Sequence, residues 1–208
     1  TSTLTCSTCH GNATLVASGA QDPNVAAAPT GTGAPDTYGN VLVSANGVGV
    51  HAAHILGTRS KPVLCNACHT VPSAQVHKTG VATAGTVVLA NLTTTGGIAN
   101  ATYATAAGTC SNTYCHGNLG GGVGAANVTP TWKTAVTLVC NSCHGMPPAT
   151  TSTGRFHPNR TDCGACHAGY TGTTVNATAH VNGVVDYTAQ TCTTCHGDPA
   201  RTGIDTAG

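Results

Sequence analysis

The chain has 208 residues and a formal net charge of +1, with only 3% aromatic and 6% charged side chains. Folding costs about 1–2 kcal/mol of conformational entropy per residue, and so few large apolar groups exclude an ordinary side-chain core. The low charge excludes a nucleic-acid-binding surface, the lack of a long apolar run excludes a membrane span, and the 12 Cys argue against a disordered chain.

Six cysteine pairs follow one another along the chain, and a histidine comes directly after each pair. Five pairs have two intervening residues, whereas TCSNTYCHG (109–117) has four. C-x-x-C-H is the attachment signature of c-type haem, in which the thiols bind the vinyl groups and the histidine ligates iron. We therefore predict six covalently attached haem c groups. The attachment residues are Cys6, Cys9, Cys65, Cys68, Cys110, Cys115, Cys140, Cys143, Cys163, Cys166, Cys192 and Cys195, and the motif histidines are His10, His69, His116, His144, His167 and His196.

Other uses of paired cysteines explain the pattern less well. Zinc sites combine two C-x-x-C pairs or a pair with spaced histidines, and give no role to an adjacent Cys-His. Disulfides suit an even cysteine count but do not explain the histidines. A thioredoxin-like motif would occur once, on a βαβ frame that this sequence lacks. In TCSNTYCHG the Cys-His adjacency is intact, so we expect a full haem site whose two extra residues bulge out beside Cys110.

Six haems in a chain of this size would themselves supply the hydrophobic core. We expect a mostly irregular multihaem c-type cytochrome, with short helical turns and few short strands wrapped around a chain of six haems. Single helical turns are expected at the motifs, including VCNSCHGM, and a weak strand over Thr86–Leu92.

Histidines outside the motifs are candidate distal ligands to iron, and there are five of them for six haems. At least one haem must therefore have another sixth ligand or an open position, and sharing between identical subunits does not change this count. Met146, the N-terminal amine and water are the alternatives, although Met146 is too close to His144 to reach the far side of that haem. The five histidines are His51, His54, His77, His157 and His180.

An internal repeat suggests how the histidines are shared. HILGTRSKPVLCNACH (54–69) parallels HPNRTDCGACH (157–167), and HKTGV parallels HVNGV further on. Two two-haem modules result, at about 51–117 and 157–197. His54 and His77 would serve the first module and His157 and His180 the second, leaving His51 for the haems at Cys6/Cys9 and Cys140/Cys143. The corresponding segments are 1–50 with the first haem, 51–139 with the first module and a linker, 140–156 with one haem, and 157–208 with the second module.

The stretches HAAHILGTRSKPVLCNACHTVP, TCSNTYCHG, PTW and CNSCHGMPP together resemble the CxxxxCH/CxxCH-domain multihaem cytochromes of metal-reducing bacteria. The likeness covers roughly residues 40–150. It implies a secreted, periplasmic or outer-surface electron carrier, in a class that includes filament-forming cytochromes with stacked haems. The sequence reaches a cysteine motif at Cys6, and we expect it to begin at a mature terminus.

The functional hypothesis is an electron conduit by haem-to-haem hopping, extracellular, assembling head to tail with other copies of itself. Haem motifs near both ends of the sequence favour this assembly, and other redox proteins or extracellular acceptors are the expected partners. Haem propionates outnumber the 7 Lys and Arg, which predicts Ca²⁺ binding. The alternatives are a reductase or peroxidase that uses a haem without a distal histidine, and a monomeric periplasmic shuttle.

Overall fold

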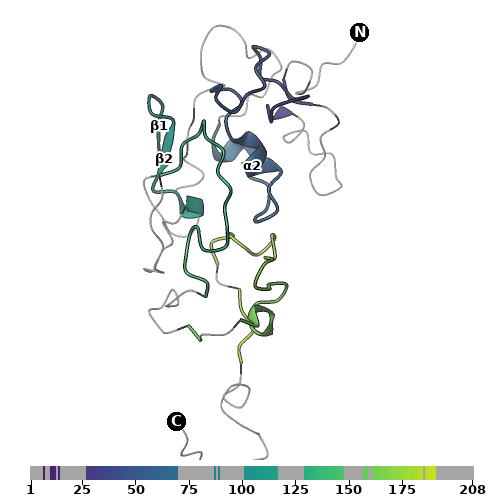
Figure 1. The fold of residues 1–208 in the computed structure, drawn as a ribbon, viewed down its shortest axis with the longest axis vertical. Coiled ribbons are helices and arrows are strands. Elements are labelled where there is room, and N and C mark those ends of the chain that lie inside the picture. The colour runs from purple at the N-terminus through teal and green to yellow at the C-terminus, as the bar shows by residue number, and fades with distance from the viewer. Residues whose placement is uncertain are drawn as a thin grey trace, which may run out of the picture.

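The computed structural model describes residues 7, 10–12, 14, 27–69, 87, 89, 101–116, 129–147, 157–158, 161–184 and 186–190. The N-terminal described segments lie in the upper part of the molecule and the C-terminal ones in the lower part (Figure 1). Residues 27–69 lie in the upper half, 101–147 run down one side, and 161–190 form the lower half. The described chain is mostly irregular, and the wrapping around six haems stays a prediction.

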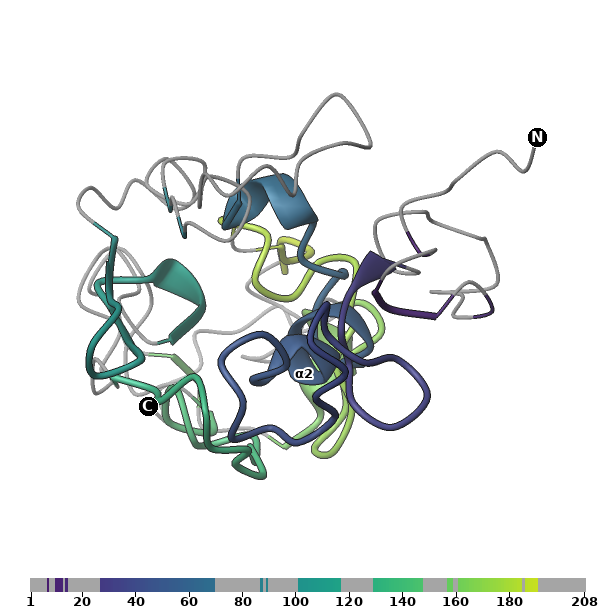
Figure 2. The same cartoon turned by 90° about the horizontal axis from the view of Figure 1, so that it is seen from above.

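The helical elements are short and lie where the histidines and cysteines are. Helix α2 (His51–Ile55) carries the sequence HAAHI and buries Ile55. Single 3-10 turns occupy Cys65–Ala67, Tyr114–His116 and Cys163–Ala165. The fourth described motif, at residues 140–144, is a series of turns and bends without a helical segment. Loops of residues 27–50 surround α2 when the molecule is seen from above (Figure 2).

A two-stranded antiparallel hairpin holds the first cysteine of the long motif. Strands β1 (Thr102–Ala104) and β2 (Thr109–Ser111) pair with Tyr103 opposite Cys110. Gly108 closes the turn with φ 66, a left-handed conformation that glycine adopts without steric cost. Of the predicted strand over 86–92 only Val87 and Leu89 are described, and Val87 forms an isolated bridge with His69.

The apolar core of the described residues is small. Its buried members are Ala27, Ala28, Ala34, Val48, Ile55 and Leu89. Large apolar side chains stay exposed beside the cysteine motifs instead: Leu64 is 49% exposed, Val139 56% and Met146 52%. Among the described residues no helix has the length and apolarity needed to cross a membrane.

Candidate haem-binding site

Two of the described attachment motifs, at 65–69 and 163–167, share one local backbone geometry. In the 65–69 motif the amides of Cys68 and His69 both donate to the Cys65 carbonyl, at 3.1 and 2.8 Å. The 163–167 motif repeats these bonds at 3.2 and 2.8 Å. This tight turn brings both cysteines and the histidine of a motif together. None of the eight described cysteines forms a disulfide, and all are half-buried.

The longer motif, at 110–116, has a different backbone structure. Cys110 belongs to strand β2, and its amide donates to the Pro130 carbonyl at 3.2 Å. Asn112 then turns the chain with φ 55, and the 3-10 turn Tyr114–His116 follows. Thr113 is 4% exposed, so the loop that follows Cys110 packs against the protein. Cys115 and His116 lie on this 3-10 turn, whereas in the 65–69 and 163–167 motifs the second cysteine and the histidine directly follow the turn.

Four histidine pairs stand out because each joins a motif histidine to a histidine outside the motifs. The ring centres are 6.1, 6.0, 6.3 and 6.2 Å apart, in chain order of the motifs. The pairs, hereafter the four histidine pairs, are His51–His69, His54–His116, His180–His144 and His157–His167. Among the histidines that the structure describes, all but His10 belong to one of these pairs, and none belongs to two of them.

This separation is the one that a shared metal ion requires. A metal–imidazole nitrogen bond is about 2.0–2.1 Å long and the ring centre lies about 1 Å further on, so two imidazoles on opposite sides of one ion have centres about 6 Å apart. Two imidazoles stacked face to face in direct contact would be closer. The residues present thus fit axial ligation of a haem iron from both sides.

The ring nitrogens are also set for this role. Nδ1 of His51 donates to the Val48 carbonyl at 2.8 Å, and Nδ1 of His54 to the Val50 carbonyl at 3.0 Å. A carbonyl only accepts, so Nδ1 carries the proton and the Nε2 lone pair is left for a metal. Nδ1 of four further histidines of the pairs likewise bonds a carbonyl oxygen. They are His144 to Gly145, His157 to Pro158, His167 to Asp186 and His180 to Arg59.

Burial keeps two of these imidazoles neutral. Desolvation lowers the pKa of His51 to about 4, helped by the nearby His69 and His54 and opposed by its backbone hydrogen bonds. Burial likewise lowers the pKa of His116 to about 4. At pH 7 both rings are therefore uncharged, which is the form that ligates a metal.

The attachment thiols of successive motifs lie close enough to shift one another's pKa values. Burial raises the pKa of the Cys68 thiol to about 11, with smaller contributions from Cys110 and Cys115. Burial also raises the pKa of Cys115, and Cys143 adds to this. The motifs at 65–69, 110–116 and 140–144 therefore form a continuous series of neighbouring sites.

The structure pairs two histidines differently from the assignment drawn from the repeat. His51 faces His69 inside the first module, whereas it was expected to serve a haem outside the repeat. His180 faces His144, across the expected boundary between segments 140–156 and 157–208. The repeat preserves local sequence, but the partner of each histidine depends on the loop that folds over it.

Hydrogen bonds of Arg59 connect His180 to the 140–144 motif. Its carbonyl accepts from Nδ1 of His180 at 2.6 Å, across 121 positions of sequence. Its guanidinium donates to the Leu138 carbonyl at 2.9 Å and lies 3.8 Å from Sγ of Cys140. Arg59 thus binds both His180 and the segment that carries Cys140.

Two aromatic residues near the pairs carried no periodic signal in the sequence. The ring centre of Trp132 lies 4.7 Å from that of His51 and 5.9 Å from that of His54. Tyr170 lies 5.7 Å from His167 and 6.2 Å from His180. In the sequence, Trp132 is marked only by the PTW triplet that contributes to the family resemblance.

The remaining candidates are less completely placed. Nδ1 of His10 contacts the Ala27 carbonyl. Met146 is 52% exposed, and its role as a ligand stays a prediction. Within the described residues no group of three or more His, Cys, Asp or Glu converges as a bare metal site would require. The candidates that lie outside the described residues are Cys6, Cys9, His77, Cys192, Cys195 and His196.

The attachment motifs define the class: a multihaem c-type cytochrome, which is an electron-transfer protein. Residues 109–144 match the family model described as the Geobacter CxxxxCH...CXXCH motif, which confirms the resemblance for this segment. Attachment of haem c implies an exported protein. Comparison with curated proteins and with solved structures finds no match.

Proposed function

We propose that the chain is a hexahaem electron conduit in which electrons pass between irons held by paired histidines. The observation that carries this proposal is the common separation of 6.0–6.3 Å in the four histidine pairs. An iron with two histidine ligands has no open position for a substrate, so such a haem is suited to electron transfer. Its potential depends on its ligands, burial and hydrogen bonds.

Continuity between sites supports conduction along the molecule. Cys110 and Cys115 are close enough to Cys68 to raise the pKa of its thiol, and Cys143 likewise raises the pKa of Cys115. Tyr170 then contacts one histidine of the 140–144 site and one of the 163–167 site. Exposed apolar residues beside the motifs, such as Leu64 and Val139, would be covered by the haem faces.

The pairing also narrows where the exceptional haem lies. Four of the five histidines outside the motifs are taken up by the four described sites, so His77 is left for the two others. The haem without a distal histidine is then the one at Cys6/Cys9 or the one at Cys192/Cys195. An open iron there would favour the second candidate function, a reductase or peroxidase.

Location and assembly are finer parts of the proposal. We place the protein outside the cell or on its outer surface, as a homopolymer that conducts from copy to copy. Its support is a nearly uncharged chain whose described part exposes large apolar side chains, among them Tyr38 at 84% and Leu42 at 68%. Haem propionates on such a surface would bind Ca²⁺, and redox proteins or extracellular acceptors would complete the circuit.

Mass and spectroscopy of the haem-loaded protein test the proposal. We expect a mass increase of six haems and a ferric spectrum in which at least four haems are low-spin with two nitrogen ligands. Fewer than four such haems would overturn the conduit. A homopolymer should appear as filaments in electron micrographs and weaken when Ca²⁺ is chelated, and monomers alone at high concentration would refute assembly.

A further inference from the structure

Trp132 and Tyr170 occupy equivalent places relative to the four histidine pairs. Trp132 contacts His51 of the 65–69 site and His54 of the 110–116 site. Tyr170 contacts His167 of the 163–167 site and His180 of the 140–144 site. Each aromatic ring therefore lies between ligands of two different haem sites, in a chain with only 3% aromatic residues.

The first pair of sites is assembled around Trp132. His51 and His54 are three residues apart on α2, a spacing that puts them on one helix face. The indole meets the His51 ring edge-on at 87° and lies at 31° to the His54 ring. An aromatic ring in these positions restricts rotation of both imidazoles, which otherwise turn about their side-chain bonds.

Trp132 is itself fixed from two directions. Its amide donates to the Gly108 carbonyl at 2.6 Å, beside the strand that carries Cys110. Its Nε1 donates to the Asn46 carbonyl at 2.9 Å, in the loop that leads to α2. Trp132 thus connects the hairpin that carries Cys110 with the loop and helix that carry His51 and His54. A Cβ atom at Gly49 would overlap the indole, so this approach requires glycine.

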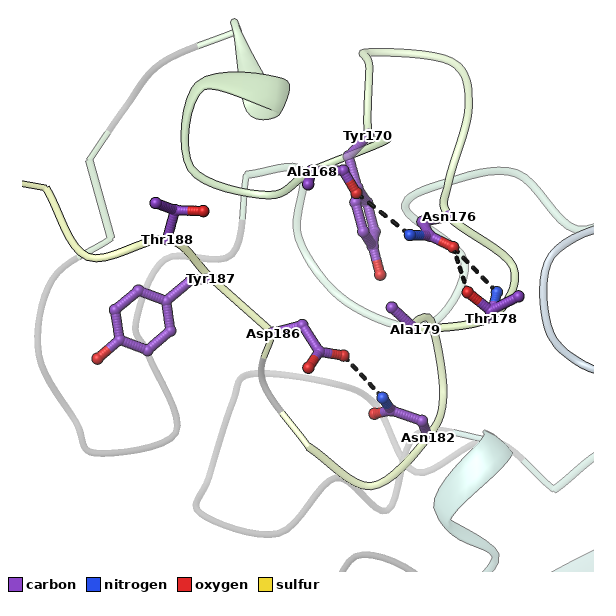
Figure 3. Close-up of a pocket in the computed structure, with 9 residues that line it drawn as sticks. All are labelled: Ala168, Tyr170, Asn176, Thr178, Ala179, Asn182, Asp186, Tyr187 and Thr188. Atoms are coloured by element: carbon purple, nitrogen blue, oxygen red, sulfur yellow. Dashed lines mark hydrogen bonds between the residues drawn. The ribbon is translucent and has the colours of Figure 1, made fainter.

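Tyr170 plays the corresponding part in the lower half. Its ring makes angles of 59° and 73° with His167 and His180. Figure 3 shows the ring between Ala168 and Ala179, beside a cavity of about 440 Å³. Its amide donates to the His167 carbonyl at 3.1 Å, which ties it to one of the two sites.

We infer that the described haem sites are organised as two dihaem units, each built around one aromatic positioning residue, Trp132 or Tyr170. The inference rests on the proposed function. With haem bound, each aromatic ring would restrict rotation of one histidine ring in both histidine pairs of its unit. The units cut across the sequence repeat, since the second joins the 140–144 and 163–167 sites.

Electron paramagnetic resonance tests this inference, because the spectrum of a low-spin ferric haem depends on the angle between its two axial rings. These angles are 32° and 71° in the unit of Trp132, and 74° and 7° in the unit of Tyr170. Trp132→Leu should shift the signals of two haems and leave the others unchanged. Tyr170→Leu should shift a different two. Tyr38→Leu is the matched control, since Tyr38 is 84% exposed.

The conservative variants Trp132→Phe and Tyr170→Phe keep a ring and should restore most of the wild-type signals. If mass spectrometry shows that a leucine variant has lost haem, the spectrum of the corresponding phenylalanine variant tests the inference instead. Leucine variants with wild-type spectra, or with equal shifts in every haem, would overturn the inference. Wild-type protein without low-spin signals from two-histidine haems would instead refute the proposed function.

Discussion

Replacing His180 with glycine tests which haem this histidine serves. His180 faces His144 at 6.3 Å, so its loss removes one ligand from the haem of the 140–144 motif. The Tyr170 ring lies 6.2 Å from His180, but burial raises the pKa of its hydroxyl, and a neutral phenol is a poor iron ligand. We therefore expect one haem of the six to become high-spin while the haem count is unchanged.

Optical and magnetic spectra of the oxidised protein measure this conversion. Added imidazole should enter the space left by the side chain and restore the low-spin spectrum, which separates loss of a ligand from general unfolding. A His180→Gly spectrum with no more high-spin haem than that of the unmodified protein, without imidazole, would refute ligation by His180.

Removal of one attachment pair identifies the haem concerned. In a Cys140→Ala/Cys143→Ala protein, the further change His180→Gly should add no high-spin signal, because its haem is already absent. In a Cys163→Ala/Cys166→Ala protein the signal should appear in full. The opposite outcome would restore the assignment drawn from the sequence repeat.

Three further predictions concern packing, charge and pH. Gly49→Ala should lower stability by about 1–3 kcal/mol more than Gly39→Ala in denaturant unfolding, because both glycines have positive φ but only Gly49 abuts the indole; equal losses would contradict this. Arg59→Gln should lower the midpoint potential of one haem in a redox titration, since a positive charge near Cys140 and Cys143 disfavours ferric iron, whereas Lys61→Gln should change none. Between pH 6.5 and pH 4, His51 and His116 should each lower the free energy of unfolding by up to about 3 kcal/mol, because each unfolded ring takes up a proton that the folded ring, with a pKa of about 4, does not bind. Ligation of iron by these rings acts with the same sign, and a free energy from denaturant unfolding that does not fall over this range would contradict the reasoning.

The attachment residues give a clear signal in the sequence because their chemistry is local. A motif such as Cys65–His69 contains both thiols, the ligand and the turn that joins them within five positions. The intact Cys115–His116 adjacency likewise identified the longer motif as a haem site. Its inward-packed Thr113 was not foreseen, because the burial of a polar residue depends on neighbours distant in sequence.

The histidine pairs could be predicted only in part. His54 and His157 lie within the modules that the repeat defines, and their partners do too. The partner of His180 depends on the carbonyl of Arg59, which is 121 positions away and which no local pattern marks. An isolated aromatic residue such as Trp132 gives no periodic signal, so its contact with two histidines became visible only in three dimensions.

The positions of the irons in the haem-loaded protein test the central claim most directly. A structure determined with iron anomalous scattering would place each iron relative to the imidazole rings. We predict one iron midway between the rings of each of the four histidine pairs, whose centres are 6.0–6.3 Å apart. Two rings of any one pair bound to different irons, or a pair without iron, would contradict the account.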